Sequence, residues 1–264
     1  SIGQFYGIEI NDFAVTVAKT ALWIAESQMM KETEMIAHIN LDFLPLKSYA
    51  NIVEGNALRT DWETVVPKDK LNYIMGNPPF VGARLMSKGQ KDDLLFVFGS
   101  EWKNAGNLDY VSCWFKKTAD LMKGTHIRAA LVSTNSVSQG ESVAILWKPL
   151  FEDGVHIDFA HRTFRWDSEA SIKAHVHCVI IGFSIAPNSR AKVIYSAERL
   201  LIVDNINAYL VDADNVFIES RNVPICDVPN LVFGSMPNDN GLLSDYSQEE
   251  RDAIVKEYPE AETV

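Results

Sequence analysis

Short apolar segments of strand type alternate with longer segments of helical periodicity through most of this chain. The strand-type segments are residues 5–10, 52–53, 71–75, 127–132, 155–160 and 176–183. Helical spacing of apolar residues falls at residues 14–29, 110–122 and 143–151. Several strand segments are apolar at nearly every position, which is typical of strands buried on both faces. The alternation predicts an α/β fold with a mainly parallel sheet covered by helices on both sides.

The pattern changes toward the end of the chain. The last two strand segments leave no room for a helix between them, so we expect them to pair antiparallel at an edge of the sheet. After Pro187 helical periodicity weakens, and Asn, Asp and Pro interrupt short β-type segments. This change predicts a boundary near residue 190, which divides the chain into a core domain, residues 1–190, and a second segment, residues 191–264.

The composition excludes several classes of protein. Of the 264 residues, 47% are hydrophobic, which allows a full core. The sequence shows no signal-peptide pattern and no apolar stretch long enough to cross a bilayer, so we expect a soluble, cytoplasmic protein. Cys113, Cys178 and Cys226 lie far apart without a CxxC pair, and we interpret all three as buried apolar residues.

Charge and histidine content limit the possible ligands. The formal net charge of −11 argues against independent binding to DNA, because DNA affinity comes mainly from Lys and Arg that neutralise phosphates. His175 and His177 share one face of a predicted strand, with His156 and His161 upstream. No further cluster of Cys, His or carboxylates completes a zinc site at the usual spacing, so we predict no metal and structural roles for these histidines.

The strongest functional signal is Asn77-Pro78-Pro79-Phe80, which directly follows a predicted strand. Such a position lies at the carboxyl end of the sheet, where α/β folds bind ligands. Two successive prolines make a stiff turn without N–H donors. The side-chain oxygen of Asn77 and the carbonyl of Pro78 can then accept both protons of an exocyclic amine, while Phe80 offers a ring for stacking. The alternative is an ordinary Pro-Pro loop with a buried Phe.

Three motifs in order give the chain a resemblance to a known family. Residues 7–10 (Gly-Ile-Glu-Ile), 54–58 (Glu-Gly-Asn-Ala-Leu) and 77–80 resemble amino-methylating DNA methyltransferases that have their cofactor motifs first. A closer resemblance to MmeI-like type IIG (type IIL) restriction-modification enzymes falls at residues 77–86, 107–123, 133–141 and 164–183. Those enzymes join an endonuclease, a methyltransferase and a target-recognition domain in one chain.

The resemblance implies a fold and an activity. The fold would be a Rossmann-like class I S-adenosylmethionine-dependent methyltransferase sheet, followed by the start of a target-recognition domain in residues 191–264. The activity would be transfer of a methyl group from S-adenosylmethionine to adenine N6 in double-stranded DNA. Cytosine N4 as the acceptor, a protein glutamine-N5 methyltransferase, and a non-catalytic DNA-recognition or scaffold segment remain as alternatives.

The resemblance also implies roles for residues at the cofactor. Glu9, with Ile10 beside it, would accept hydrogen bonds from the ribose hydroxyls, and a helix-flanking surface carboxylate is the alternative. Asn56, with Ala57, lies where the family usually has Asp beside the cofactor adenine, and a turn-forming Asn is equally compatible. Asn77 would contact both the cofactor and the target amine.

Other matched positions concern the target base and the DNA. Phe164 corresponds to the aromatic residue that packs against the flipped base, with Trp166 as a rival. Asp109 and Tyr110 match a region that lines the methionine end of the cofactor, although Asp109 also fits a helix N-cap. In the second segment the candidates for DNA contact are Arg199 and Arg221.

One family motif has no counterpart in this sequence. The chain contains no Gly-x-Gly, whereas the family has a Gly-rich turn after its first strand. In comparable nucleotide folds the acidic ribose contact follows that turn by about 20 residues, and Glu9 lies too early for this. We therefore expect a fragment that lacks its first strand, leaves sheet edges unpaired and binds the cofactor weakly or not at all by itself.

Overall fold

The computed structural model describes residues 2–39, 51–166, 176–196, 199–221, 223–224, 226–228 and 247–259. The chain divides into two compact units, Ser1–Glu219 and Ser220–Val264. The first unit contains the described strands and the helices α1 to α4, and the second contains α5 (Gln248–Glu257). Within the described residues, no helix is both long and apolar enough to span a membrane.

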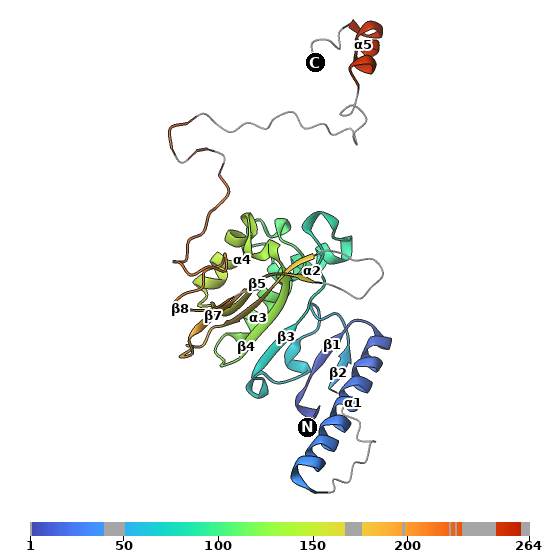
Figure 1. Ribbon diagram of the computed structural model, residues 1–264, viewed down its shortest axis with the longest axis vertical. Helices are drawn as coiled ribbons and strands as arrows, with labels where there is room; N and C mark the ends of the chain where they lie inside the picture. The colour runs from blue at the N-terminus through green and yellow to red at the C-terminus, as the bar shows by residue number, and fades with distance from the viewer. Residues whose placement is uncertain are drawn as a thin grey trace. The chain divides into compact units, whose positions relative to one another are not determined.

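The strands of the first unit form two sheets (Figure 1). β1 (Gly7–Glu9) and β2 (Ile52–Glu54) make a small parallel pair. The large sheet has the order β3-β4-β6-β5-β7-β8. Its strands are β3 (Tyr73–Gly76), β4 (Arg128–Thr134), β5 (His156–Trp166), β6 (Val176–Ser184), β7 (Lys192–Tyr195) and β8 (Leu200–Val203). Within the described residues, β1 and β3 each pair with a single strand, so one edge of each is unpaired.

The large sheet is mixed, whereas the sequence predicted a mainly parallel one. β3 with β4 and β5 with β7 are parallel, and the other described pairings in this sheet are antiparallel. β6 returns directly after β5 and inserts between β4 and β5, so it runs against both neighbours. The expected antiparallel pairing of these two strands is confirmed, but they lie inside the sheet rather than at its edge.

β7 and β8 extend the large sheet beyond residue 190. β7 pairs with β5 at Phe159↔Val193, and β8 pairs with β7. β7 and β8 therefore share a sheet with strands that precede residue 190, and the first compact unit continues to Glu219, while the domain division at residue 190 stays a prediction. The short β-type segments after Pro187 build edge strands of the first unit. The assignment of residues 191–264 to target recognition stays a prediction.

The helices begin at residues with recognisable caps. The Asn11 side chain accepts a hydrogen bond from the Ala14 amide at 3.0 Å and so caps the start of α1. Ser87 and Gln90 form a capping box before α2, a helix that the apolar pattern did not predict. The four helices of the first unit are α1 (Asp12–Ala37), α2 (Lys88–Phe98), α3 (Ser112–Met122) and α4 (Glu141–Glu152).

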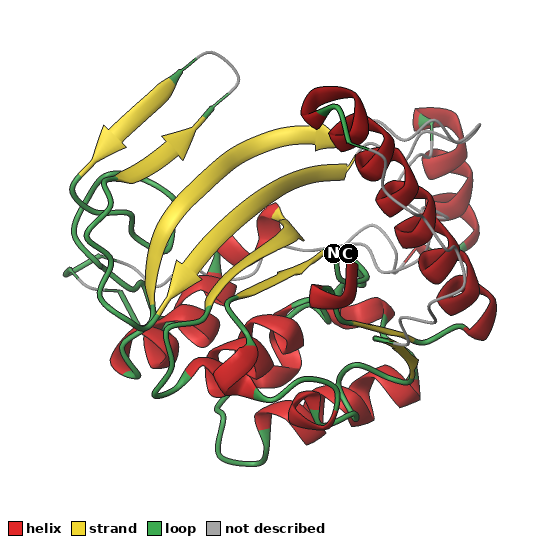
Figure 2. Ribbon diagram, turned by 90° about the horizontal axis from the view of Figure 1, so that it is seen from below, coloured by secondary structure: helices red, strands yellow, loops and turns green. Residues whose placement is uncertain are grey.

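The core lies between the large sheet and the helices α3 and α4 (Figure 2). Phe115 of α3, Trp147 of α4 and Phe183 of β6 are fully buried, with ring centroids 5.3–6.2 Å apart. Burying one such side chain contributes roughly 1.5–3 kcal/mol. On the opposite face Val132 and Ile180 are only half-buried. Among the described residues, this second face is therefore less completely covered than the face under α3 and α4.

Gly182 of β6 makes room for an aromatic ring on the less covered face. It pairs with Phe159 of β5 in register. A Cβ atom at position 182 would lie 2.0 Å from Cε1 of Phe159, so the ring passes directly over the glycine. No larger residue fits there without moving the ring.

The cysteines differ in exposure. Cys113 and Cys178 are buried, as expected, and burial raises the pKa of Cys113 to about 12. Cys226 is exposed, so its predicted burial is wrong. It lies in the second unit, where every described residue from 220 to 228 is exposed.

Candidate functional site

A cleft with a volume of about 1170 Å³ opens between the small sheet and the free edge of β3. Its walls come from the end of β1, the turn after β2, the end of β3 and the start of α2. The predicted site residues in its lining are Glu9, Ile10, Asn56, Ala57, Asn77, Pro78, Pro79 and Tyr110. Segments far apart in the sequence therefore meet at one cleft, while Phe80 and Phe164 lie outside its lining.

Asn77 stands at the carboxyl end of β3, where the strand stops at Gly76. Its side chain is exposed and lines the cleft. Pro78 is buried, which anchors the corner, and Pro79 is exposed. Phe80 is half-buried and packs against the hydrophobic core. The double-proline corner thus presents its polar first residue to the cleft and its ring toward the core.

The segment after the double-proline corner is fixed by the residues before α3. Asp109 Oδ1 accepts a hydrogen bond from the Ala83 amide at 2.9 Å, and the Tyr110 amide donates to the Val81 carbonyl at 2.9 Å. Asp109 was also a candidate N-cap. That interpretation is wrong, because the N-cap of α3 is Val111 and no side chain caps the helix. The Asp109 carboxylate instead stiffens the loop that carries Asn77.

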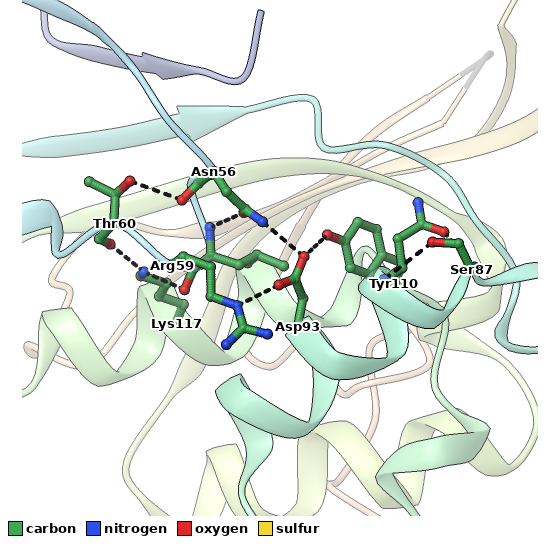
Figure 3. A network of polar contacts seen from close by, with 9 residues as sticks. Asn56, Arg59, Thr60, Ser87, Asp93, Tyr110 and Lys117 are labelled. Carbon is green, nitrogen blue, oxygen red and sulfur yellow. Dashed lines mark hydrogen bonds and ion pairs between the residues drawn. The ribbon is translucent and has the colours of Figure 1, made fainter.

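Asp93 of α2 is the centre of a polar network beside the cleft (Figure 3). Its side chain is nearly buried and accepts three hydrogen bonds. The donors are Asn56 Nδ2 at 2.9 Å, Arg59 Nε at 2.5 Å and the Tyr110 hydroxyl at 2.8 Å. Hydrogen bonds to a charged group contribute about 1.5–3 kcal/mol each. The network therefore ties α2, the turn after β2 and the segment before α3 together.

The electrostatics of Asp93 follow from these contacts. Burial alone would raise the pKa of Asp93, but the hydrogen bonds from Arg59, Asn56 and Tyr110 outweigh burial and lower it. Burial and the Asp93 carboxylate together raise the pKa of Tyr110. Asp93 is therefore a fixed negative charge at neutral pH, and Tyr110 keeps its proton to donate.

Asn56 uses both ends of its amide within the protein. Its Oδ1 accepts from the Leu58 amide at 2.9 Å, which folds the turn after β2, and its Nδ2 donates to Asp93. Lys117 of α3 holds the same turn, with Nζ donating to the carbonyls of Leu58 and Thr60 at 2.9 and 2.6 Å. Asn56 thus has the geometry of a turn-forming residue, and its contact with a cofactor stays a prediction.

Phe164 lies at the same edge of the large sheet as Asn77. β3, β4 and β5 run in one direction, because β3 is parallel to β4, and β4 and β5 both pair antiparallel with β6. Three strand spacings separate β3 from β5, roughly 14 Å at about 4.8 Å each. Phe164 is half-buried and packs edge-on against His161, with centroids 4.9 Å apart. The side chain of its rival Trp166 lies outside the described residues.

Residues 1–196 match the family model described as MmeI, DNA-methyltransferase domain. The chain belongs to this family. DNA methyltransferase A of Bacillus subtilis (strain 168) is 44% identical over 263 residues, covering 98% of this chain and 30% of that protein. The structure of the type IIL restriction-modification enzyme MmeI in complex with DNA is similar with a TM-score of 0.89 and 40% identity, over 98% of this chain and 35% of that one. The chain thus spans about a third of each relative.

A grouping of Ser, His and Asp in this MmeI-family domain is structural. His156 Nε2 lies 3.0 Å from Ser184 Oγ and 3.4 Å from Asp158 Oδ1. A catalytic triad needs the acid on the other ring nitrogen, and Ser184 is fully buried. Within the described part of the chain, no three His, Cys, Asp or Glu residues are arranged to hold a metal, and His175 lies outside it.

The predicted DNA contacts of the MmeI-family chain lie in different units. Arg199 follows β7 and is exposed. Because β7 is parallel to β5, Arg199 lies at the same edge of the large sheet as Phe164. Arg221 is exposed in the second unit. Contact of either residue with DNA stays a prediction.

Sequence reasoning missed Asp93 and Arg59, which line the cleft of this MmeI-family domain, and Lys117, which holds the turn after β2. The capping box at Ser87 and Gln90 was a local signal for α2, the helix that carries Asp93. No local pattern singles out Asp93 itself, because its partners lie 17 to 37 residues away.

Proposed function

We propose that this chain is the DNA adenine-N6 methyltransferase segment of a larger restriction-modification protein, with S-adenosylmethionine as the methyl donor. The observation that carries the proposal is Asn77, exposed at the end of β3 and lining a cleft that Glu9 also lines. Membership of the MmeI DNA-methyltransferase family supports it. The cleft exceeds the usual size of a small-molecule site, about 300–1,000 Å³, so it has room for the cofactor and a base.

The residues of the cleft have distinct tasks in this proposal. Glu9 accepts hydrogen bonds from the cofactor ribose, and Ile10 and Ala57 contact the adenosine. Asn77 Oδ1 and the Pro78 carbonyl accept the two protons of the adenine amine. S-adenosylmethionine supplies an electrophilic methyl carbon. The amine nitrogen would form a bond to that carbon as the carbon–sulfur bond breaks, S-adenosylhomocysteine would leave as a neutral thioether, and the methylated amine would release one proton to water.

Catalysis in this scheme comes from positioning, without a covalent enzyme intermediate. The hydrogen bonds of Asp109 and Tyr110 to Ala83 and Val81 support this, because they hold the loop that follows the double-proline corner. The target adenine leaves the duplex to reach the cleft. Phe80 and Phe164, which lie outside the lining of that cleft, are the rings proposed to pack against the base beside it. Since the net charge is −11, most of the basic DNA-binding surface belongs to the rest of the protein.

We also propose that the cofactor site is complete only with a further strand between β1 and β3. Both strands have a free edge in the described sheets, and residues of both line the cleft. A strand with the family's Gly-rich turn would pair with both edges and close the cleft at the methionine end of the cofactor. This proposal accounts for the absence of Gly-x-Gly from the sequence.

Replacement of Asn77 tests the proposed function. In the full-length protein Asn77→Ala is expected to abolish methylation of DNA while the melting temperature and DNA affinity stay unchanged. Asn72→Ala, an exposed residue just before the same strand, is the matched control and keeps activity. Mass spectrometry of the product distinguishes N6-methyladenine from N4-methylcytosine. Full activity of Asn77→Ala, or methylation of protein glutamine only, contradicts the proposal.

A further inference from the structure

A second cleft, with a volume of about 300 Å³, lies at the carboxyl edge of the large sheet. Its lining includes Arg162 and Thr163 of β5, the residues from Ser138 to Gly140 that precede α4, and Tyr209. The cleft is separate from the larger one, since the two share no lining residue. It belongs to neither the proposed cofactor site nor the proposed amine site.

A β-bulge turns Arg162 toward this cleft. His161 pairs with Ile180 and Phe164 pairs with Cys178, so Arg162 and Thr163 together oppose the single residue Val179. In a regular strand two consecutive side chains point to opposite faces of the sheet. Here both line the same cleft. The bulge is therefore the reason that an arginine faces the cleft.

The cleft is positively charged within an acidic chain. Its lining contains no Asp or Glu, and no described carboxylate forms an ion pair with Arg162. Tyr209 adds a neutral donor, because its hydroxyl accepts from the Ile218 amide at 3.4 Å and keeps its own proton to donate. Gln139, which is exposed, adds an amide group. A guanidinium without an ion pair among the described residues, with neutral donors beside it, is suited to a phosphate oxygen.

The cleft is held rigidly to the end of β4. Thr163 Oγ1 donates to Asn135 Oδ1 at 3.2 Å, and Ser138 Oγ donates to the Asn135 carbonyl at 3.0 Å. Arg162 precedes Phe164 by two residues, about 7 Å along a strand. A nucleotide whose base packs on Phe164 therefore brings its backbone within reach of the Arg162 side chain.

We propose that this cleft binds a backbone phosphate of the DNA strand that carries the target adenine, with Arg162 as its cation. The inference rests on the proposed function, because it needs DNA at this edge of the sheet. A phosphate contact fixes the orientation of the duplex and carries no sequence information. Its loss weakens binding to every DNA sequence alike and lowers the dependence of affinity on salt.

Equilibrium DNA binding by the full-length protein, over a series of salt concentrations, tests the inference. Arg162→Ala is expected to weaken binding about tenfold to target and unrelated duplexes alike, and to reduce the slope of log affinity against log salt by about one. Arg162→Lys keeps the positive charge, so it is expected to keep most of the dependence of DNA affinity on salt. Arg190→Ala is the matched control, because Arg190 is exposed before β7, at the opposite edge of the sheet. An affinity and slope of Arg162→Ala equal to those of the unaltered protein overturn the inference.

Neutral methylphosphonate substitutions in the DNA identify the phosphate. A methylphosphonate at one position beside the target adenine is expected to weaken DNA binding by the unaltered protein about as much as Arg162→Ala does. The same substitution is expected to have no further effect on DNA binding by Arg162→Ala. If a methylphosphonate at every tested position weakens DNA binding by Arg162→Ala as much as it weakens DNA binding by the unaltered protein, the inference is overturned. Two outcomes separate the two proposals. If Arg162→Ala binds and methylates DNA as well as the unaltered protein does, the phosphate site alone is wrong. If the unaltered protein neither binds nor methylates DNA, both proposals are wrong.

Discussion

The Tyr110 hydroxyl donates a hydrogen bond to Asp93 Oδ2 at 2.8 Å, while the amide of the same tyrosine holds the Val81 carbonyl. One residue therefore joins α2 to the loop that carries Asn77. Because Asp93 also binds Asn56 and Arg59, the turn after β2 and the double-proline corner are linked through this carboxylate.

Removing the Tyr110 hydroxyl tests this link. Tyr110→Phe leaves Asp93 with one donor fewer in a nearly buried position, so we expect the free energy of unfolding to fall by about 1–3 kcal/mol. Chemical denaturation measures the change. Tyr258→Phe, at an exposed position in the second unit, serves as the control and is expected to be neutral. A Tyr110→Phe variant as stable as the unaltered protein would show that the hydroxyl contributes nothing to the link.

The lowered pKa of Asp93 predicts a pH dependence of stability. The folded pKa lies below the unfolded value of about 3.9, so the ionised carboxylate stabilises the fold above that value. This contribution is lost as the pH falls through the folded pKa. Between pH 7 and pH 3 we therefore expect the unfolding free energy of the unaltered protein to drop more than that of Asp93→Asn. Asp92→Asn, its exposed neighbour, is expected to keep the unaltered pH profile, and parallel curves for all three proteins would contradict the prediction.

Gly182 is predicted to be intolerant of even a methyl group. Gly182→Ala puts Cβ about where the Phe159 ring lies, and overpacking of this kind costs roughly 1–3 kcal/mol. Thermal unfolding is expected to show a lower melting temperature, and Phe159→Ala in the same chain removes the clash. Gly106→Ala is the control, because nothing lies within 4 Å of its Cβ position. If Phe159→Ala does not raise the melting temperature of Gly182→Ala, the Phe159 ring is not the cause of the destabilisation.

Cofactor binding by the 264-residue chain tests whether the site needs a further strand. We expect calorimetry to detect weak binding of S-adenosylmethionine or none, because among the described strands β1 and β3 each have a free edge beside the cleft. The full-length protein is expected to bind it with ordinary affinity. Micromolar binding to the 264-residue chain would mean that the residues described here suffice.

Local features of this fold were predictable from the sequence, and features that depend on distant contacts were not. The apolar spacing at residues 14–29 predicted α1, and the strand before Asn77 predicted where the double-proline corner lies, because both signals are contained in neighbouring residues. The order of the large sheet was not predictable in this way. β6 inserts between β4 and β5 through pairings with strands on both sides, which a periodic pattern does not contain.

The residues of the candidate site also divide into those that local sequence signals predicted and those that only distant contacts define. Eight predicted residues line one cleft, mainly because motifs at strand ends meet at the carboxyl edge of an α/β sheet. The sequence left the role of Asn56 undecided, since only the folded chain brings the Asp93 carboxylate to its side-chain amide. The exposure of Cys226 was mispredicted because a cysteine by itself does not indicate whether its segment joins a core.

The unpaired edges of β1 and β3 also bear on how the 264-residue chain behaves when it is produced by itself. An open strand edge has vacant backbone donors and acceptors and is a template for joining another molecule. On β3 that edge carries Tyr73 and Met75, which are 64% and 76% exposed. At high concentration such chains are expected to aggregate edge to edge, so solubility tags and dilute handling suit this polypeptide better than concentration for crystals.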